Sequence, residues 1–204
     1  MAAVQRQSDW LDPELVLKAY MIGVFPMAEG ADSDELMWIK PEVRGILPLD
    51  TFHIPKRLAR TLRVSDLEFR FSTNFDAVID GCAEAKTGRE TTWINGAIRT
   101  AYRDLFLRGH CHTVEAWRGE KLVGGLYGIS LGAAFFGESM FSRETDASKL
   151  CLVKLVERLT ERRYTLLDSQ FITPHLKRFG AIEVLRIRYE TMLAQALARQ
   201  ARFI

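Results

Sequence analysis

Residues 122–137, with the sequence LVGGLYGISLGAAFFG, decide the fold of this chain of 204 residues. The stretch has no charged residue and contains five glycines, a density that strongly disfavours a helix. It is also shorter than the roughly 20 apolar residues that a membrane-spanning helix needs. We therefore predict buried β-strands at 122–129 and 133–138 rather than a membrane span.

The segments around this stretch add strands and helices to the sheet. Alternating or continuous apolar residues predict further strands at 67–72, 113–117, 164–168 and 182–189. Apolar residues at helical spacing predict helices after Asn74, at 94–106, after Asp146 and after Thr173. From residue 113 onward the order is strand, strand, strand, helix, strand, helix, strand. This order resembles the core of the GNAT acyltransferases, in which acyl donors bind where two central strands splay apart.

The predicted fold is therefore α+β, a GNAT-like mixed sheet flanked by helices, with a small N-terminal α/β domain. We place the small domain at 1–65 and the GNAT-like domain at 66–204. In the small domain Asp12 and Pro13 begin a helix for which Gly23 offers an end. Short strands are expected at 36–39 and 45–47, since prolines follow both runs.

Composition excludes several classes of protein. The chain has 28 Lys and Arg against 26 Asp and Glu, a formal net charge of +2 with histidines neutral. This balance rules out a polybasic tail but not a local nucleic-acid site, because attraction to phosphate depends on where charge clusters. With 48% hydrophobic residues, the chain can bury a full core, which excludes disordered, collagen and coiled-coil classes.

Cysteines and the N-terminus indicate the compartment. Cys82, Cys111 and Cys151 are odd in number and lack C-x-x-C spacing, so neither a disulfide framework nor a zinc site is favoured. Residues 1–10 carry Arg6 and Asp9 and no apolar core typical of a secretory signal. We expect a cytoplasmic protein without a membrane partner.

A basic run precedes the predicted GNAT-like domain. Residues 53–63 contain Lys56, Arg57, Arg60 and Arg63 and no acid. On a helix Lys56 or Arg57 shares a face with Arg60, because residues three and four apart are neighbours. The face is either a solvated surface or a contact for an anion such as an RNA backbone.

Three polar residues stand out in apolar surroundings. Glu138 is the only charged residue among the 21 at 122–142, so its carboxylate is either paired with a distant arginine or functional. Asp168 and Gln170 end the strand predicted at 164–168, and they point the same way if the chain stays extended. Polar side chains at strand ends bind ligands in open α/β sheets, and helix capping is the alternative for Asp168.

Other chemical motifs are missing. His110 and His112 share a strand face, but no third ligand has metal spacing, so hydrogen bonding is the expected role. No P-loop, GxSxG or GxGxxG occurs. Residues 142–149, SRETDASK, contain no glycine and two acids, unlike the glycine loop with which GNAT enzymes hold the CoA pyrophosphate. CoA is therefore disfavoured, and we expect neither cofactor nor metal.

Longer motifs resemble the bacterial leucyl/phenylalanyl-tRNA–protein transferases. The most specific are GGLYG at 124–128, GESMFS at 137–142 and Asp168 with Gln170, and Ala147-Ser148-Lys149 matches as well. Matching residues elsewhere are Ala19-Tyr20, Gly23, Phe25-Pro26, Trp38, Pro41, Arg44, Thr92-Trp93-Ile94, Ala101-Tyr102 and Gly180-Ala181. The match runs over most of the chain.

The resemblance implies a function and partners. Such an enzyme moves Leu or Phe, and by extension Met, from an aminoacyl-tRNA to the N-terminal Arg or Lys of a protein, which marks that protein for degradation. The expected partners are leucyl-tRNA and phenylalanyl-tRNA, through their 3′ acceptor ends, and proteins beginning with Arg or Lys. The enzyme is expected to act as a monomer, with tRNA in the place of CoA.

The resemblance also implies residue roles. Asp168 would orient Gln170, Gln170 would accept a hydrogen bond from the attacking amine, and Glu138 would meet the acceptor. The aminoacyl side chain would enter a pocket formed by Leu126, Met140, Leu152, Leu155, Leu159 and Leu167, for which plain core packing is the alternative. Tyr20, Trp93 and Tyr102 would hold the 3′ adenosine. Lys56, Arg57, Arg60 and Arg63 would contact tRNA phosphates.

The chain departs from the family at a few positions. Met27 stands where many members have Trp, Met37 replaces the first of a Trp pair, and Pro55-Lys56 interrupts a usual Ser-Arg. Asp146 and Thr173 each replace an Asn. Asp146 is expected to cap the following helix, and Thr173 to alter the hydrogen bonds around Gln170. Two alternatives stay open: a GNAT-like N-acyltransferase with another carrier such as CoA, and a tRNA-binding adaptor without catalysis.

Overall fold

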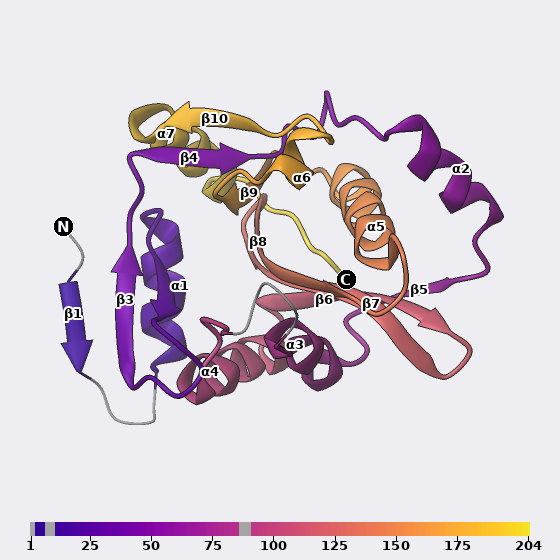
Figure 1. Cartoon of the computed structure of the whole chain (residues 1–204). Coiled ribbons are helices and arrows are strands. Elements are labelled where there is room, and N and C mark those ends of the chain that lie inside the picture. Colours follow the sequence, from indigo (N-terminus) through magenta and orange to yellow (C-terminus); the bar gives the residue numbers. More distant parts are fainter. Residues whose placement is uncertain (1–2, 7–10, 86–90) are drawn as a thin grey trace.

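The computed structural model describes residues 3–6, 11–85 and 91–204 and contains two sheets (Figure 1). The small antiparallel sheet has the order β1-β3-β2, with β1 at Ala3–Arg6, β2 at Phe25–Ala28 and β3 at Glu35–Ile39. The large sheet has the order β10-β4-β9-β8-β7-β6-β5. Its strands are β4 (Val43–Ile46), β5 (Glu68–Phe71), β6 (Cys111–Arg118), β7 (Lys121–Leu131), β8 (Ala134–Ser142), β9 (Leu166–Gln170) and β10 (Ile182–Leu185).

The centre of the large sheet is the glycine-rich stretch. β7 and β8 pair antiparallel, as the uncharged run 122–137 predicts, and their register shifts between Tyr127 and Gly128. At Gly128 a Cβ atom would lie 2.3 Å from the carbonyl oxygen of Phe136. Only glycine fits there, because the neighbouring strand approaches too closely for any side chain.

β8 and β9 form a parallel pair that soon ends. Their register runs from Ala134 opposite Leu166 to Phe136 opposite Asp168, and no pairing follows. Beyond this point the strands no longer share a ladder, although both continue. The gap between them is the splayed arrangement that the GNAT-like order predicted.

Helices cover both faces of the large sheet (Figure 1). Helix α5 (Ala147–Glu161) packs on one face of β6, β7 and β8. Helix α3 (Phe75–Ala83) contacts the same three strands from the opposite side, where α4 (Gly96–Leu107) packs on β6 and α3. The remaining helices are α1 (Pro13–Met21), α2 (Lys56–Val64), α6 (Pro174–Lys177) and α7 (Arg186–Leu197).

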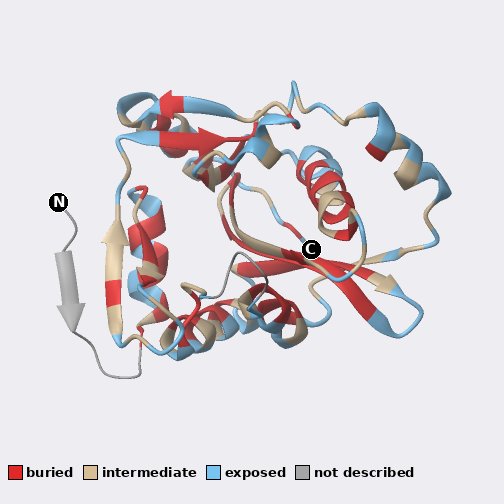
Figure 2. Cartoon of the chain, in the orientation of Figure 1, coloured by how far each residue is buried: buried red, intermediate tan, exposed pale blue. Residues whose placement is uncertain are grey.

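The two faces carry two separate cores, and Figure 2 shows buried residues concentrated on the central strands and the helix faces that cover them. Tyr127 and Phe136 belong to the core with α3 and α4. Their neighbours Leu126 and Phe135 belong to the core with α5. Side chains alternate between faces along a strand, so β7 and β8 supply both cores.

Most predicted elements are confirmed, including the caps at Asp12, Asn74 and Thr173, whose side chains accept backbone N–H groups of the helices that they begin. The strand predicted at 182–189 ends at Leu185, and α7 begins at Arg186. The strand β2 was not predicted, because Pro26 interrupts a short run.

Asp146 does not cap α5, contrary to the prediction. Its backbone is left-handed, with φ of 65°, and its side chain makes no capping bond. It pairs with Lys149 instead. The hydroxyl of Ser142 accepts the backbone N–H of Ser148 at 2.8 Å, so a residue from β8 caps the first turn of α5.

The division at residue 65 stays a prediction, although strand pairing bears on it. β4 lies inside the large sheet, between β9 and β10. Residues 43–46, expected in the small domain, are therefore built into the larger sheet. The expectation about a secretory signal falls on residues 1–10, of which only the strand 3–6 is described. Within the described residues, no helix is long and apolar enough to cross a membrane.

Candidate active site

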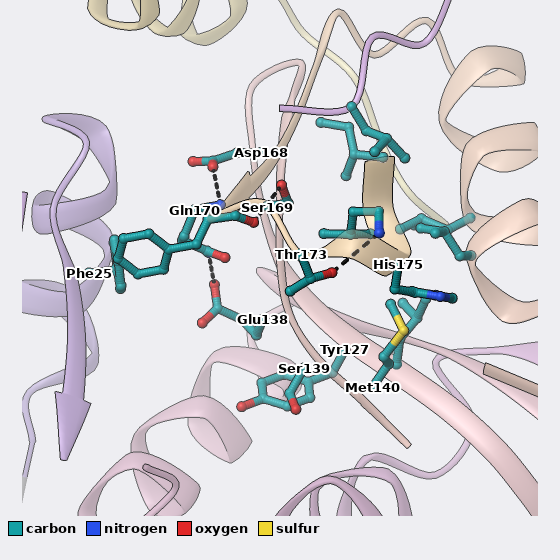
Figure 3. Close-up of a pocket in the computed structure, with 18 of the residues that line it drawn as sticks. Phe25, Tyr127, Glu138, Ser139, Met140, Asp168, Ser169, Gln170, Thr173 and His175 are labelled. Carbon is teal, nitrogen blue, oxygen red and sulfur yellow. Dashed lines mark hydrogen bonds between the residues drawn. The ribbon is translucent and has the colours of Figure 1, made fainter. Parts of the chain in front are cut away.

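Glu138 and Gln170 meet where β8 and β9 separate. The Gln170 side-chain Nε2 donates a hydrogen bond of 3.0 Å to Glu138 Oε1, and Figure 3 shows the two side chains facing each other. Each residue lies two positions beyond the last residue of its strand that pairs β8 with β9. The end of the parallel ladder thus places a carboxylate and an amide side by side with no strand pairing to close the space.

Glu138 lies in surroundings that disfavour its charge. Burial raises the pKa of its carboxyl to about 8, and the nearby Asp168 adds to the rise. The Tyr102 hydroxyl donates to Glu138 Oε2 at 3.5 Å, and it shares a bond of 2.6 Å with the Tyr20 hydroxyl. Two tyrosines therefore back the carboxylate from inside the protein.

This position contradicts the role expected for Tyr20 and Tyr102. Both side chains are fully buried, so neither ring face is open to the base of an adenosine. Trp93 differs, because it lines the cavity described below. The prediction failed for the tyrosines because an aromatic residue in a sequence does not reveal whether its ring is covered.

Asp168 is held by a buried ion pair. Arg44 Nε donates to both carboxylate oxygens at 2.9 and 3.0 Å, and Arg44 Nη2 donates to Oδ2 at 2.6 Å. Tyr189 also donates to Oδ2, at 2.6 Å. Because Asp168 is 0% exposed and its oxygens are engaged, it is a positioning residue rather than a proton acceptor.

Gln170 is the last residue of β9, but its backbone is not extended, contrary to the geometry assumed from the sequence. Its φ is 56°, in the left-handed region, and its backbone N–H donates to Asp168 Oδ1 at 2.8 Å. That bond compensates for an unfavourable conformation. Asp168 therefore orients Gln170, as expected, but through the backbone, and the turn aims the Gln170 amide at Glu138.

Arg44 is the residue that sequence reasoning left without a role. Besides Asp168, its Nη1 donates to the Gly23 carbonyl at 3.0 Å, and its guanidinium lies over the rings of Phe25 and Tyr189. An arginine beside the apolar run Gly45-Ile46-Leu47 was the available signal, since a buried charge needs a partner.

A cavity of about 350 Å³ opens beside this centre. Five of the six predicted pocket residues line it: Leu126, Met140, Leu152, Leu155 and Leu167. Leu159 does not line the cavity and is fully buried in the core. It lies on the same side of α5 but one turn further along. Phe25, Met27, Leu47, Phe171 and Leu176 complete most of the apolar wall.

Comparison with known proteins identifies the family. A model of the leucyl/phenylalanyl-tRNA protein transferase family matches residues 46–194, and a model of that family's N-terminal domain matches residues 10–42. The chain belongs to the leucyl/phenylalanyl-tRNA protein transferase family. It is therefore an enzyme of the aminoacyl-tRNA–protein transferase class.

Two solved structures resemble this transferase only distantly. One is the L-PGS of Bacillus licheniformis, with 11% identity, a TM-score of 0.46 and coverage of 93% of this chain and 71% of the other. The second is the C-terminal domain of a protein described as a lysylphosphatidylglycerol synthetase from Agrobacterium fabrum. It shows 10% identity, a TM-score of 0.44 and coverage of 95% of this chain. The transferase spans 64% of the length of that second chain.

The basic run of the transferase forms the predicted helix, α2, whose Lys56, Arg57, Arg60 and Arg63 side chains are all exposed. Leu58 on the same helix is buried, and α2 packs beside α5. The four cations therefore stay in solvent while an apolar residue anchors the helix. The geometry leaves them available to a polyanion.

Two of the departures from the family line the cavity. Met27 forms part of the apolar wall. Thr173 accepts the backbone N–H of Leu176 at 3.2 Å, and no bond to Gln170 is present. The Thr173 hydroxyl therefore caps α6, and the expectation that Thr in place of Asn alters the hydrogen bonds around Gln170 stays a prediction.

His112 and the three cysteines lie in the interior of the protein. His112 is buried against the Ser72 hydroxyl and the Phe203 ring, and burial lowers its pKa to about 4. The three cysteines are free and buried. Among the described residues, no group of three or more His, Cys, Asp or Glu side chains is placed to hold a metal ion.

Proposed function

We propose that this transferase moves Leu or Phe from the 3′ end of an aminoacyl-tRNA to the α-amine of a protein that begins with Arg or Lys. The observation that carries the proposal is the Glu138–Gln170 pair beside an apolar cavity. The cavity accepts the aminoacyl side chain, and the polar pair receives the amine. Such a product would carry a new N-terminal residue that marks it for degradation.

The lining of the cavity supports Leu and Phe as the transferred residues. Its walls at Leu126, Met140 and Leu155 are apolar and flexible, and an unbranched Met adapts to aliphatic and aromatic side chains. A charged side chain would lose its hydration without a partner. The same flexibility would admit Met.

Glu138 and Gln170 have different roles at the reacting amine: Gln170 orients it, and Glu138 accepts its proton. Since Gln170 Nε2 donates to Glu138, the amide Oε1 is turned to accept a hydrogen bond from the amine. The pKa of Glu138, about 8, lies close to that of an α-amino group, about 7.7 to 8.0. Transfer of the α-ammonium proton to the Glu138 carboxylate then costs little free energy.

The neutral amine attacks the ester carbonyl carbon. A C–N bond forms, the C–O bond to the ribose breaks, and the proton that the attacking nitrogen loses goes to the ribose oxygen. The ester is already activated, so the enzyme acts mainly by holding the two reactants in line, which supplies about 7 to 11 kcal/mol at best. The bonds from Asp168 and Glu138 that fix Gln170 serve this positioning.

The tRNA would be held at its end. Trp93 lines the cavity and would stack on the terminal adenine, a contact that contributes about 1 to 3 kcal/mol. Lys56, Arg57, Arg60 and Arg63 on α2 would contact phosphates. This proposal assigns no stacking role to the buried Tyr20 and Tyr102.

The test is transfer of labelled Leu from Leu-tRNA to a peptide beginning with Arg. The matched controls are the same peptide with an acetylated N-terminus and a peptide beginning with Glu. Transfer to the Arg peptide alone supports the proposal. Binding of tRNA without transfer would indicate an adaptor, and acylation from acetyl-CoA would indicate the GNAT-like alternative.

A further inference from the structure

A second, polar cavity of about 170 Å³ lies between α2, α6 and the start of α5. Its charged or titratable lining consists of Arg57, Asp146, Lys149, His175 and Arg178. These residues come from three segments that are distant in the sequence. Among them, only Arg57 belongs to the basic run for which the sequence predicts contacts with phosphates.

This polar cavity adjoins the cavity beside Glu138 and Gln170 that is proposed to hold the aminoacyl side chain. His175 lines both cavities, and a third hollow, lined by Met140, Lys149 and His175 among others, joins them. Figure 3 shows His175 and Met140 at the side of the aminoacyl cavity away from Phe25. We call these adjoining hollows, which are lined by Met140, His175, Lys149 and Arg57, the polar groove.

The groove carries excess positive charge. Lys149 pairs with Asp146, but neither Arg57 nor Arg178 forms an ion pair with a carboxylate in the described part of the chain. Arg143 and Glu144, which line the third hollow, are paired with Glu84 and Arg118. Burial and the adjoining Lys149 and Arg178 keep the pKa of His175 below its usual value.

We propose that the polar groove binds the backbone phosphates of the unpaired nucleotides that precede the terminal adenosine of the donor, through Arg57, Lys149 and Arg178. The inference rests on the proposed function, because it needs an aminoacyl end in the cavity. Two unpaired guanidinium groups in a groove that leaves the reaction centre favour an anion. A donor whose end is fixed in the aminoacyl cavity must leave it, and this groove leads to the basic helix α2.

Three donors of increasing length test the proposal: Phe-adenosine, the trinucleotide CCA carrying Phe, and full Phe-tRNA. The variant is Arg178→Ala, with Arg188→Ala, which removes an exposed arginine of α7, as the matched control. Loss of one charged contact should raise KM roughly tenfold for CCA-Phe and for Phe-tRNA alike. KM for Phe-adenosine should hardly change, because that donor has no phosphate. Arg188→Ala should leave all three values unchanged.

A second variant should act in the opposite direction. Asp146→Asn keeps the shape and tolerates the left-handed backbone, but it removes the negative charge that pairs with Lys149. The other acid in the lining of the groove, Glu144, stays paired with Arg118. The substitution should lower KM for CCA-Phe several-fold. A purely structural disturbance would not strengthen binding.

Each other outcome overturns the proposal. A rise in KM for Phe-adenosine as well would mean that Arg178 maintains the shape of the aminoacyl cavity. A rise in KM for Phe-tRNA alone would mean that Arg178 contacts the acceptor stem. Equal KM values in Arg178→Ala and wild type would remove it from the donor site. If the wild type transfers from none of the donors, the proposed function fails. Fluorescence anisotropy of labelled CCA without an amino acid then measures whether the same variants still bind it, and so tests the groove separately.

Discussion

The Gln170 side-chain amide donates a hydrogen bond to Glu138 across the gap between β9 and β8, two strands that begin as hydrogen-bonded neighbours. The contact exists because the chain turns left-handed at Gln170, and that turn is held by the Asp168 carboxylate, which Arg44 neutralises. The Glu138–Gln170 pair of the candidate site therefore stands at the end of a series of hydrogen bonds that begins at Arg44 in β4.

The raised pKa of Glu138 predicts the pH dependence of transfer. If the carboxylate takes the amine proton, kcat should rise with pH up to about 8 and then level off. Glu138→Gln keeps the shape but has no titration, so its kcat should be lower and should lose this rise. Single-turnover rates between pH 6 and 9 measure both profiles. An unchanged profile in Glu138→Gln would assign the titration to the acceptor amine.

The same raised pKa of Glu138 also predicts how the free energy of unfolding depends on pH, and this can be measured without the transfer reaction. The folded state holds the Glu138 proton up to about pH 8, whereas the unfolded carboxyl releases it near 4.5. The contribution of this group therefore favours folding at low pH and declines as pH rises between those values. In urea unfolding at pH 5 and pH 8, Glu138→Gln should show a smaller decline than wild type. Equal declines would contradict the raised pKa.

Arg44 should matter for both stability and transfer. Arg44→Met leaves the buried Asp168 carboxylate unpaired, which should cost about 3 to 5 kcal/mol of unfolding free energy. The double variant Arg44→Met with Asp168→Leu removes both charges and should regain much of that loss in urea titrations. It should still transfer slowly, because nothing then holds Gln170. Recovery of transfer together with stability would show that the pair is only structural.

Leu155 should control the choice between Phe and Leu. Leu155→Trp fills the cavity from α5, so Phe transfer should be abolished before Leu transfer. Leu159 provides the matched control, because it is buried one turn along the same helix but lines no part of the cavity. Leu159→Trp should lower the melting temperature and leave the ratio of Phe to Leu kcat/KM unchanged. Equal loss of both substrates in Leu155→Trp would count against the cavity as the aminoacyl site.

Substitutions at Trp93 and at Tyr102 should change different kinetic constants. Trp93→Ala should raise KM for the donor by roughly tenfold, since one base–aromatic stack contributes about 1 to 3 kcal/mol. Tyr102→Phe removes the hydroxyl behind Glu138 and should lower kcat with little change in KM. Steady-state kinetics with both variants distinguishes the two roles. A KM effect in Tyr102→Phe would restore the stacking role expected from the sequence.

The cations of α2 should act through tRNA phosphates. Arg60→Glu with Arg63→Glu should raise KM for tRNA and reduce the slope of log KM against log salt by roughly two, one for each lost contact. The exposed pair Arg188→Glu with Arg199→Glu makes the same charge change elsewhere. KM for tRNA is measured from 50 to 200 mM salt for both double variants. An unchanged slope in the α2 variant would mean that α2 does not contact the tRNA.

Most of the secondary structure could be predicted from local patterns. The caps at Asp12, Asn74 and Thr173 and the glycine-rich strands depend on neighbours in the chain, so the residues alone reveal them. The failures have a common cause. The end of the strand at Leu185 and the left-handed backbone of Asp146 depend on packing and pairing with distant segments.

The sequence by itself determined the α+β class, the strands around Gly128, the isolated carboxylate at Glu138 and the resemblance to the family, because periodicity and motifs are properties of neighbouring residues. Only the tertiary structure decided which polar residues meet. Arg44 and Asp168 are 124 positions apart, and the burial of Tyr20 and Tyr102 depends on helices packing from separate parts of the chain. A sequence shows which groups can ionise or stack, whereas burial and distance decide which of them do.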